Sequence, residues 1–299
     1  MDKKYFLEIE NVMRKNLDKR GMDKIKLLGE FERGVKDLLR SSTVFIVTGF
    51  VIRDSLTGET DGPIGAISLA SALEKLGKKV VLITDKYSKD MLYNCCMVKH
   101  MKTPIEVVPY NDTEEFCSDL LIKYNPSHIV GIERSGRGKD GCCYSMRGEN
   151  LSDLVPNTDI LFEKSKELGI RTLAVGDGGN EVGMGKVAPF VINSVNKGSQ
   201  ICAKIATDHL IVAGVSNWGG HGLVAALSIL SNVMLLHDAK TEILLLEGML
   251  RAGAVDGCTK KPTMSVDGLS LEENVQILER LKRIVEEELD KQEEKILAV

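Results

Sequence analysis

The chain has 299 residues, 43% of them hydrophobic and 27% charged, which is typical of a soluble globular protein and excludes a disordered or fibrous one. Lys and Arg number 39 against 43 Asp and Glu, so the net charge is −4, and we expect neither nucleic acid nor a membrane as a partner. The seven cysteines lack any C-x-x-C spacing and indicate reduced thiols rather than a zinc site. Without an apolar secretory signal at its start, the sequence predicts a cytoplasmic protein.

Short β-branched runs alternate with amphipathic stretches after a charge-rich, helical N-terminal arm at residues 1–40, which we expect to lie on the surface. The predicted strands are Val44–Val51, Val80–Ile83, Ile105–Val108, His128–Ile132, Thr172–Val175 and Leu210–Val215. Helices are predicted between them, one ending at Gly77 and one over Ile160–Leu168 ending at Gly169. This alternation predicts a single α/β domain over 1–299, with a mostly parallel open sheet, helices on both faces, and N- and C-terminal helices.

Two apolar stretches near the C-terminus are predicted to be helices. The run Leu223–Leu236 contains Ser228 and Ser231, so we interpret it as a buried helix and not a membrane span. Ser270 and Glu273 have the spacing of a capping box at the start of a helix over 270–297. Its apolar stripe is expected to pack on the protein's own core, and a homo-oligomer contact remains the alternative.

In an open α/β sheet, ligands bind beyond the carboxyl ends of the strands, so polar clusters that follow strands are the candidate sites. The first cluster is 58–66, where Asp61 is predicted to cap a helix and to leave the amides of Gly62 and Gly65 free for an anion. Glu59 and Asp61 make a small amino acid a better ligand than a polyphosphate. The alternative is a capped turn without a ligand.

The second cluster, 133–140, follows the strand that begins at His128. Arg134 and Arg137 each offer a guanidinium fork that matches a carboxylate or phosphate. Glu133 is expected to orient that fork or to receive an ammonium group. A solvated charged loop without a ligand is the alternative.

The third cluster, 176–185, follows a strand as a dinucleotide-binding motif would, but Glu181 stands where the third glycine of G-x-G-x-x-G belongs. The Walker pattern fails as well. Asp177 and Glu181 instead suit a base, an ammonium site or, less readily, a metal, and Asn180 joins them as a candidate substrate-binding residue. A flexible glycine turn with a cap is the alternative.

The fourth cluster, 216–222, opens the buried helix. Ser216 and Asn217 could donate hydrogen bonds to a substrate carboxylate or an oxyanion. His221 at a helix start is a candidate neutral base, with a capping or packing role as the alternative. Because no nucleophile elbow, H-E-x-x-H or Cys–His signature is present, chemistry by carboxylates and positioned dipoles remains.

These four segments together resemble the D-glutamate cyclase family. The resemblance is carried by G-E-T-D-G-P-I-G-A at 58–66, E-R-S-G-R at 133–137, G-D-G-G-N-E-V-G-M-G-K at 176–186 and A-G-V-S-N-W-G-G at 213–220. It covers a cyclase-like core over 43–250, in a stand-alone, bacterial-type form of a region that is C-terminal in the mammalian mitochondrial cyclase. It implies a hydro-lyase that converts D-glutamate to 5-oxo-D-proline and water. The family tends to have Tyr at the position of His221, which argues against His221 as an essential base.

For this reaction we hypothesise that Asp177 or Glu181 takes the ammonium proton and the other acts as the acid. Arg134, Arg137 and the helix start at Gly62 are the candidate carboxylate clamp, and Ser216 and Asn217 would stabilise the oxyanion. No cofactor is predicted, and no motif supports a divalent metal. The alternatives are a non-catalytic binder of an acidic amino acid or its lactam, and a metal-dependent hydrolase with Mg²⁺ between Asp177, Glu181 and Glu133.

Overall fold

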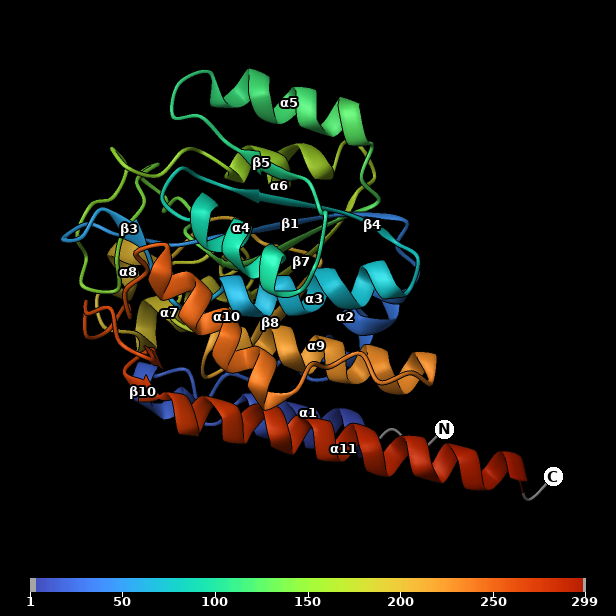
Figure 1. Ribbon diagram of the computed structural model, residues 1–299. Coiled ribbons are helices and arrows are strands. Elements are labelled where there is room, and N and C mark those ends of the chain that lie inside the picture. The colour runs from blue at the N-terminus through green and yellow to red at the C-terminus, as the bar shows by residue number, and fades with distance from the viewer. Residues whose placement is uncertain (1–3, 298–299) are drawn as a thin grey trace.

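The computed structural model describes residues 4–297, which form an α/β fold around a six-stranded parallel sheet (Figure 1). The strands, in spatial order, are β5 (Ile105–Val107), β4 (Lys79–Thr84), β1 (Thr43–Gly49), β6 (His128–Arg134), β7 (Arg171–Gly176) and β8 (His209–Val212). All six predicted strands are therefore confirmed. When the six strands are numbered by their order in the chain, their order across the sheet is 3-2-1-4-5-6. The sheet is therefore doubly wound, and the strand order reverses between β1 and β6.

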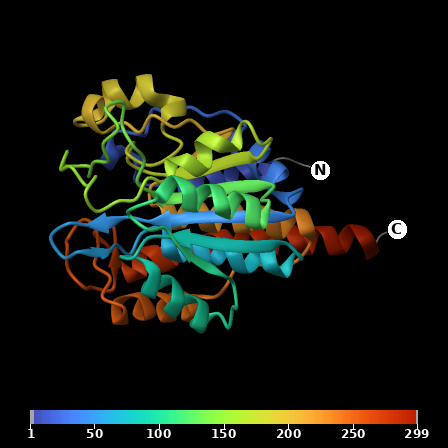
Figure 2. The same ribbon diagram turned by 90° about the horizontal axis from the view of Figure 1, so that it is seen from above.

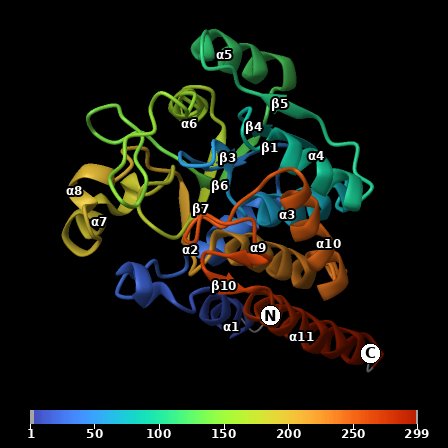
Figure 3. The ribbon, with the colours of Figure 1, turned by 60° about the vertical axis from the view of Figure 1, so that its left-hand side comes forward.

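Helices cover both faces of the sheet, as predicted (Figure 3). One face carries α3 (Pro63–Lys75), α4 (Lys89–Val98) and α9 (Ser216–Ser231), with α10 (Ala239–Arg251) packed on α4, and the other carries α5 (Thr113–Tyr124) and α6 (Asp159–Ser165). Successive residues of a strand point to opposite faces. Val44 and Ile46 of β1 accordingly join the core under α3 and α9, whereas Phe45 and Val47 join the core under α5 and α6.

One predicted helix ends close to its glycine, the helix predicted to end at Gly169 stops earlier, at Ser165, and a third helix begins with a capping box. Gly77 and Gly169 have φ of 76° and 68°, a conformation that glycine adopts without the steric cost of a Cβ, and they follow α3 and α6. At α11 (Leu271–Leu297), the Ser270 hydroxyl accepts from the Glu273 amide while the Glu273 carboxylate accepts from the Ser270 amide. The buried stripe of α11 packs on α9, so the predicted contact with its own core is confirmed.

The N-terminal arm is part of the fold, and the prediction that it lies on the surface is wrong. It consists of α1 (Lys4–Met13), the 3-10 turn η1 (Leu17–Arg20) and α2 (Glu30–Leu39). Phe6, Ile9 and Met13 are buried in the main core, and α1 lies beside α9 and α11 (Figure 1). The charged residues of α1 alternate with an apolar face that needs a partner, and α9 and α11 supply it.

Loops and two small hairpins gather at the carboxyl end of the sheet (Figure 2). The hairpins are β2 (Val51–Ile52) with β3 (Thr57–Gly58), and β9 (Ser265–Val266) with β10 (Leu269–Ser270). The short helices α7 (Ala188–Ser194) and α8 (Gly198–Ile201), with the 3-10 turn η2 (Gly185–Val187), complete the elements. All seven cysteines are free thiols. Across residues 4–297, no helix combines the length and apolar character that a membrane crossing requires.

Candidate active site

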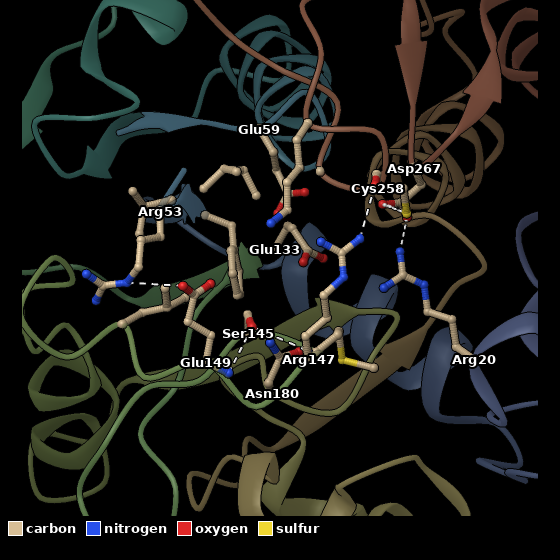
Figure 4. Close-up of a pocket in the computed structure, with 17 residues that line it drawn as sticks. Arg20, Arg53, Glu59, Glu133, Ser145, Arg147, Glu149, Asn180, Cys258 and Asp267 are labelled. Atoms are coloured by element: carbon tan, nitrogen blue, oxygen red, sulfur yellow. Dashed lines mark hydrogen bonds and ion pairs between the residues drawn. The ribbon is translucent and has the colours of Figure 1, made fainter. Parts of the chain in front are cut away.

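A cavity of about 190 Å³ opens at the carboxyl ends of β1 and β6, where the strand order reverses (Figure 4). Ligands of doubly wound sheets bind at this position. The charged residues that line it are Arg20, Arg53, Glu59, Glu133, Arg147, Glu149, Lys260 and Asp267. The cavity is smaller than the roughly 300–1,000 Å³ pockets of drug-sized ligands, so it suits a small polar molecule.

Glu133 is a tightly constrained carboxyl group in the cavity. It is the second-last residue of β6, has a φ of 45° and is only 6% exposed. Its carboxylate accepts a hydrogen bond from the Ser216 hydroxyl at 2.5 Å. A Cβ on Gly62 would come within 2.5 Å of the Glu133 Cβ, so only glycine allows this approach. Residues held in a left-handed conformation of this kind are concentrated at functional sites, which points to Glu133.

The carboxyl groups around the cavity are close enough together for their negative charges to repel one another. Oxygens of Asp61, Asp177 and Asp267 lie within 4.8 Å of one another, and the same holds for Glu133, Asp177 and Glu181. Burial, and then neighbouring carboxylates, raises the pKa of Asp61 to about 7. Burial also raises the pKa of Glu59, Glu133 and Asp177 well above the usual carboxyl range. The cluster therefore holds protons near neutral pH and offers both acids and bases.

Arg20 brings positive charge into this acidic cluster. Its Nη2 lies 3.2 Å from the Asp177 carboxylate and donates a hydrogen bond to Asp267. Asp177 is 1% exposed, and within residues 4–297 its carboxylate oxygens have no hydrogen-bond partner, so the guanidinium of Arg20 is the charged group beside it. The N-terminal arm thus contributes a residue to the site.

The predicted anion site at the start of α3 is wrong, because α3 and α9 cap each other. The Asn217 side-chain oxygen accepts from the amides of Gly62 and Gly65, at 3.0 and 2.8 Å. The Asp61 carboxylate, instead of capping α3, accepts from the amides of Ser216 and Asn217, both at 2.8 Å. These amides are occupied by the protein itself, and the Ser216 hydroxyl is committed to Glu133, so neither the clamp nor the predicted oxyanion donors are free.

Neither predicted arginine of the second cluster lines the cavity. Arg134 is 1% exposed, and its guanidinium donates to Asp85, to Thr158 and to the Gly49 carbonyl. Arg137 donates to the Gly141 carbonyl at 2.5 Å. The prediction of these two as the carboxylate clamp is therefore wrong, because neither lines the cavity and the donors of Arg134 already serve buried acceptors.

Glu181 holds the glycine loop of the third cluster together. Its two carboxylate oxygens accept from the amides of Gly178 and Gly179 at 2.8 and 2.7 Å, and neither Glu181 nor Asp177 lines the cavity. Asn180 does line it, while its side chain donates to the Tyr144 carbonyl. Asp177 and Glu181 therefore lie next to the cavity but outside the set of side chains that line it.

His221 does not belong to the acidic site. It is buried with its Nε2 3.3 Å from one Glu242 oxygen, and the Nε2 of His237 lies 2.5 Å from the other. This His–Glu–His cluster joins α9 to α10. A separation of 2.5 Å is that of a hydrogen bond and leaves no space for an ion between these two groups.

Several site residues escaped sequence reasoning. Arg20 lies in the charge-rich arm, and Arg147 lies in a loop with no strand directly before it. Lys260 and Asp267 lie between α10 and α11, beyond the core predicted to end at 250. The one available signal was the paired turn sequence Asp256-Gly257 and Asp267-Gly268, which is unusual for an inter-helix connection.

The fold and the site together define a doubly wound α/β protein with a small cavity, lined by charged side chains, at the point where the strand order reverses. Residues 9–282 match the family described as D-glutamate cyclase-like, C-terminal. The chain belongs to this family, and the resemblance found in the sequence is confirmed.

One curated relative is D-glutamate cyclase, mitochondrial, from Homo sapiens, which is 33% identical over 237 residues. The aligned part covers 75% of this chain and 38% of the human protein. The chain therefore spans well under half the length of this relative.

Proposed function

We propose that this protein is a D-glutamate cyclase, a hydro-lyase that converts D-glutamate to 5-oxo-D-proline and water. The proposal is supported by the family and by one observation above all, the cluster of buried carboxyl groups with raised pKa values around a small cavity. We propose the cytoplasm as its location.

The reaction moves two protons from nitrogen to oxygen. A carboxylate of the protein takes one proton from the substrate ammonium, and a carboxylic acid of the protein protonates the γ-carboxylate. The amine attacks the γ-carbon, so a C–N bond forms. The nitrogen then gives its second proton to the group that acted as acid, and the group that acted as base returns its proton to the departing hydroxyl. A C–O bond breaks, water leaves, and both protein groups regain their starting forms.

Glu133 and Glu59 are the groups we propose for this exchange. Both line the cavity, both are less than 8% exposed, and Figure 4 shows them directed into the same space. Glu133 is 6% exposed and fixed by Ser216, so its position is set before a ligand arrives. Asp177 and Glu181, which sequence reasoning placed in these roles, instead support the site, Asp177 through Arg20 and Glu181 through the glycine loop.

No cofactor is part of the proposal. Arg20 stands between Asp177 and Asp267, where a cation held by these carboxylates would lie. A metal-dependent hydrolase is therefore the weaker alternative. The partner is a small acidic amino acid.

A binder of an acidic amino acid or its lactam would use the same pocket without turnover. Incubation of the protein with D-glutamate, followed by chiral detection of 5-oxo-D-proline, separates the two functions. We expect product with the wild type, none with heat-inactivated protein, and wild-type rates with Glu163→Gln, an exposed glutamate on α6. Binding without product would refute the cyclase and support the binder.

A further inference from the structure

Arg20 is held in one place by the backbone around it. The turn η1 that ends at Arg20 lies between Asn16 and Gly21, both left-handed with φ of 70° and 74°. A Cβ on Gly21 would come 2.8 Å from the Ser194 carbonyl oxygen, so the chain passes where only glycine fits. Leu17 and Met22 on either side are buried in a shared apolar cluster. The arm therefore presents the Arg20 side chain to the cavity from a fixed position.

The guanidinium of Arg20 has hydrogen-bond donors that its two carboxylate partners do not use. Its contacts with Asp177 and Asp267 both use Nη2. Within residues 4–297, Nη1 and Nε of Arg20 have no hydrogen-bond partner, and Figure 4 shows the guanidinium at the edge of the cavity, on the side of Asp267 and Cys258. An arginine fixed by two carboxylates with donors to spare is suited to bind a ligand carboxylate.

The other cations around the site are less suited to this task. Arg53 is paired with Asp153, and Lys260 donates to Asp54 at 2.5 Å. Arg147 is exposed and donates to the Cys258 carbonyl at 3.2 Å. These three side chains also line the cavity, where their positive charge attracts an anion.

We propose that Arg20 binds the α-carboxylate of the substrate and thereby makes the site specific for an amine that carries a carboxylate on its own carbon. This inference rests on the proposed function. The α-carboxylate and the reacting amine share one carbon, so a carboxylate on Arg20 brings the amine to the carboxyl groups beside it. The γ-carboxyl group, which must be protonated, then lies away from the guanidinium and among the acids.

The titratable and charged groups that face Arg20 come from several elements. They are Glu59 and Asp61 near β3, Glu133 on β6, Asp177 after β7, and Cys258 and Asp267 in the segment before α11. Burial raises the pKa of Glu59, Asp61, Glu133 and Asp177, which reduces the negative charge that a substrate carboxylate meets.

The test compares the binding of two lactams by calorimetry, using the full chain. 5-Oxo-D-proline carries the carboxylate, and 2-pyrrolidinone is the same ring without it. We expect the wild type to bind 5-oxo-D-proline about 10- to 100-fold more tightly, the range of a hydrogen-bonded charge pair. Arg20→Met should abolish this preference and leave 2-pyrrolidinone binding unchanged. Lys19→Met, an exposed neighbour in the same turn, should behave as the wild type.

Two further variants separate recognition from folding. Arg20→Lys keeps the charge but loses the fork, and we expect an intermediate preference. Arg20→Met with Asp267→Asn removes one positive and one negative charge together, so local charge balance is kept, and the preference should still be lost. A folded Arg20 variant without the guanidinium that retains the wild-type preference overturns the assignment. A wild-type protein that binds neither lactam and makes no product overturns the proposed function itself. This result differs from a wild type that turns over D-glutamate while the Arg20 variants keep its preference, which overturns only the assignment of Arg20.

Discussion

Replacement of Glu133 by Gln should make the protein slower and, at alkaline pH, more stable. Gln has the shape of Glu and can still accept the hydrogen bond from Ser216, and the left-handed backbone at this position is unchanged. Only the exchangeable proton is lost. General acid–base catalysis contributes about 100- to 10,000-fold, so we expect kcat/KM for D-glutamate to fall by that range.

The stability effect follows from the pKa of Glu133, which burial raises well above its unfolded value. A carboxyl group with a raised folded pKa binds more protons in the folded state, so the free energy of unfolding falls as pH rises from the unfolded pKa to the folded one. Each unit of this difference is worth about 1.4 kcal/mol. Because Gln does not titrate, the variant should match the wild type in unfolding midpoint near pH 4 and exceed it by a growing margin toward pH 8.

The assay is the initial rate of 5-oxo-D-proline formation between pH 5 and 9, with thermal unfolding followed over the same range and Glu163→Gln as the control. A Glu133→Gln protein with the wild-type rate and pH profile would refute its role as an acid or base. A variant that loses stability as pH rises, relative to the wild type, would refute the electrostatic account of the buried cluster.

Three further outcomes are expected. Arg134→Met should destabilise the fold by about 3–5 kcal/mol, because it leaves the buried Asp85 without its partner, and chemical denaturation measures this; a loss below 1 kcal/mol would contradict the assigned ion pair. Glu181→Gln should cost about 1.5–3 kcal/mol, since an amide cannot accept from both Gly178 and Gly179, and its activity should fall less than that of Glu133→Gln. Activity should survive dialysis against a chelator, because Arg20 already neutralises Asp177 and Asp267; loss that Mg²⁺ restores would favour the metal-dependent alternative.

Much of the fold follows from local patterns in the chain. The β-branched runs correspond to the six strands of the sheet, and the glycines at 77 and 169 follow α3 and α6, because strand burial and helix termination depend on a few neighbouring residues. The capping box at Ser270 and Glu273 formed for the same reason. The position of the N-terminal arm could not be predicted in this way, because its apolar face packs on α9 and α11, which lie more than 200 residues away in the sequence.

The sequence also located the polar clusters that follow the strands, but it did not predict which partner each side chain binds. The chain by itself located Glu133 and Asp61 at the edge where ligands bind and indicated chemistry by carboxyl groups. Only the tertiary structure decided that Asn217 caps α3, that Arg134 serves Asp85, and that Arg20 enters the site from the arm. A side chain acts through the partner it meets. These partners come from segments distant in sequence, so packing, rather than local pattern, determines which acids and cations remain available to a substrate.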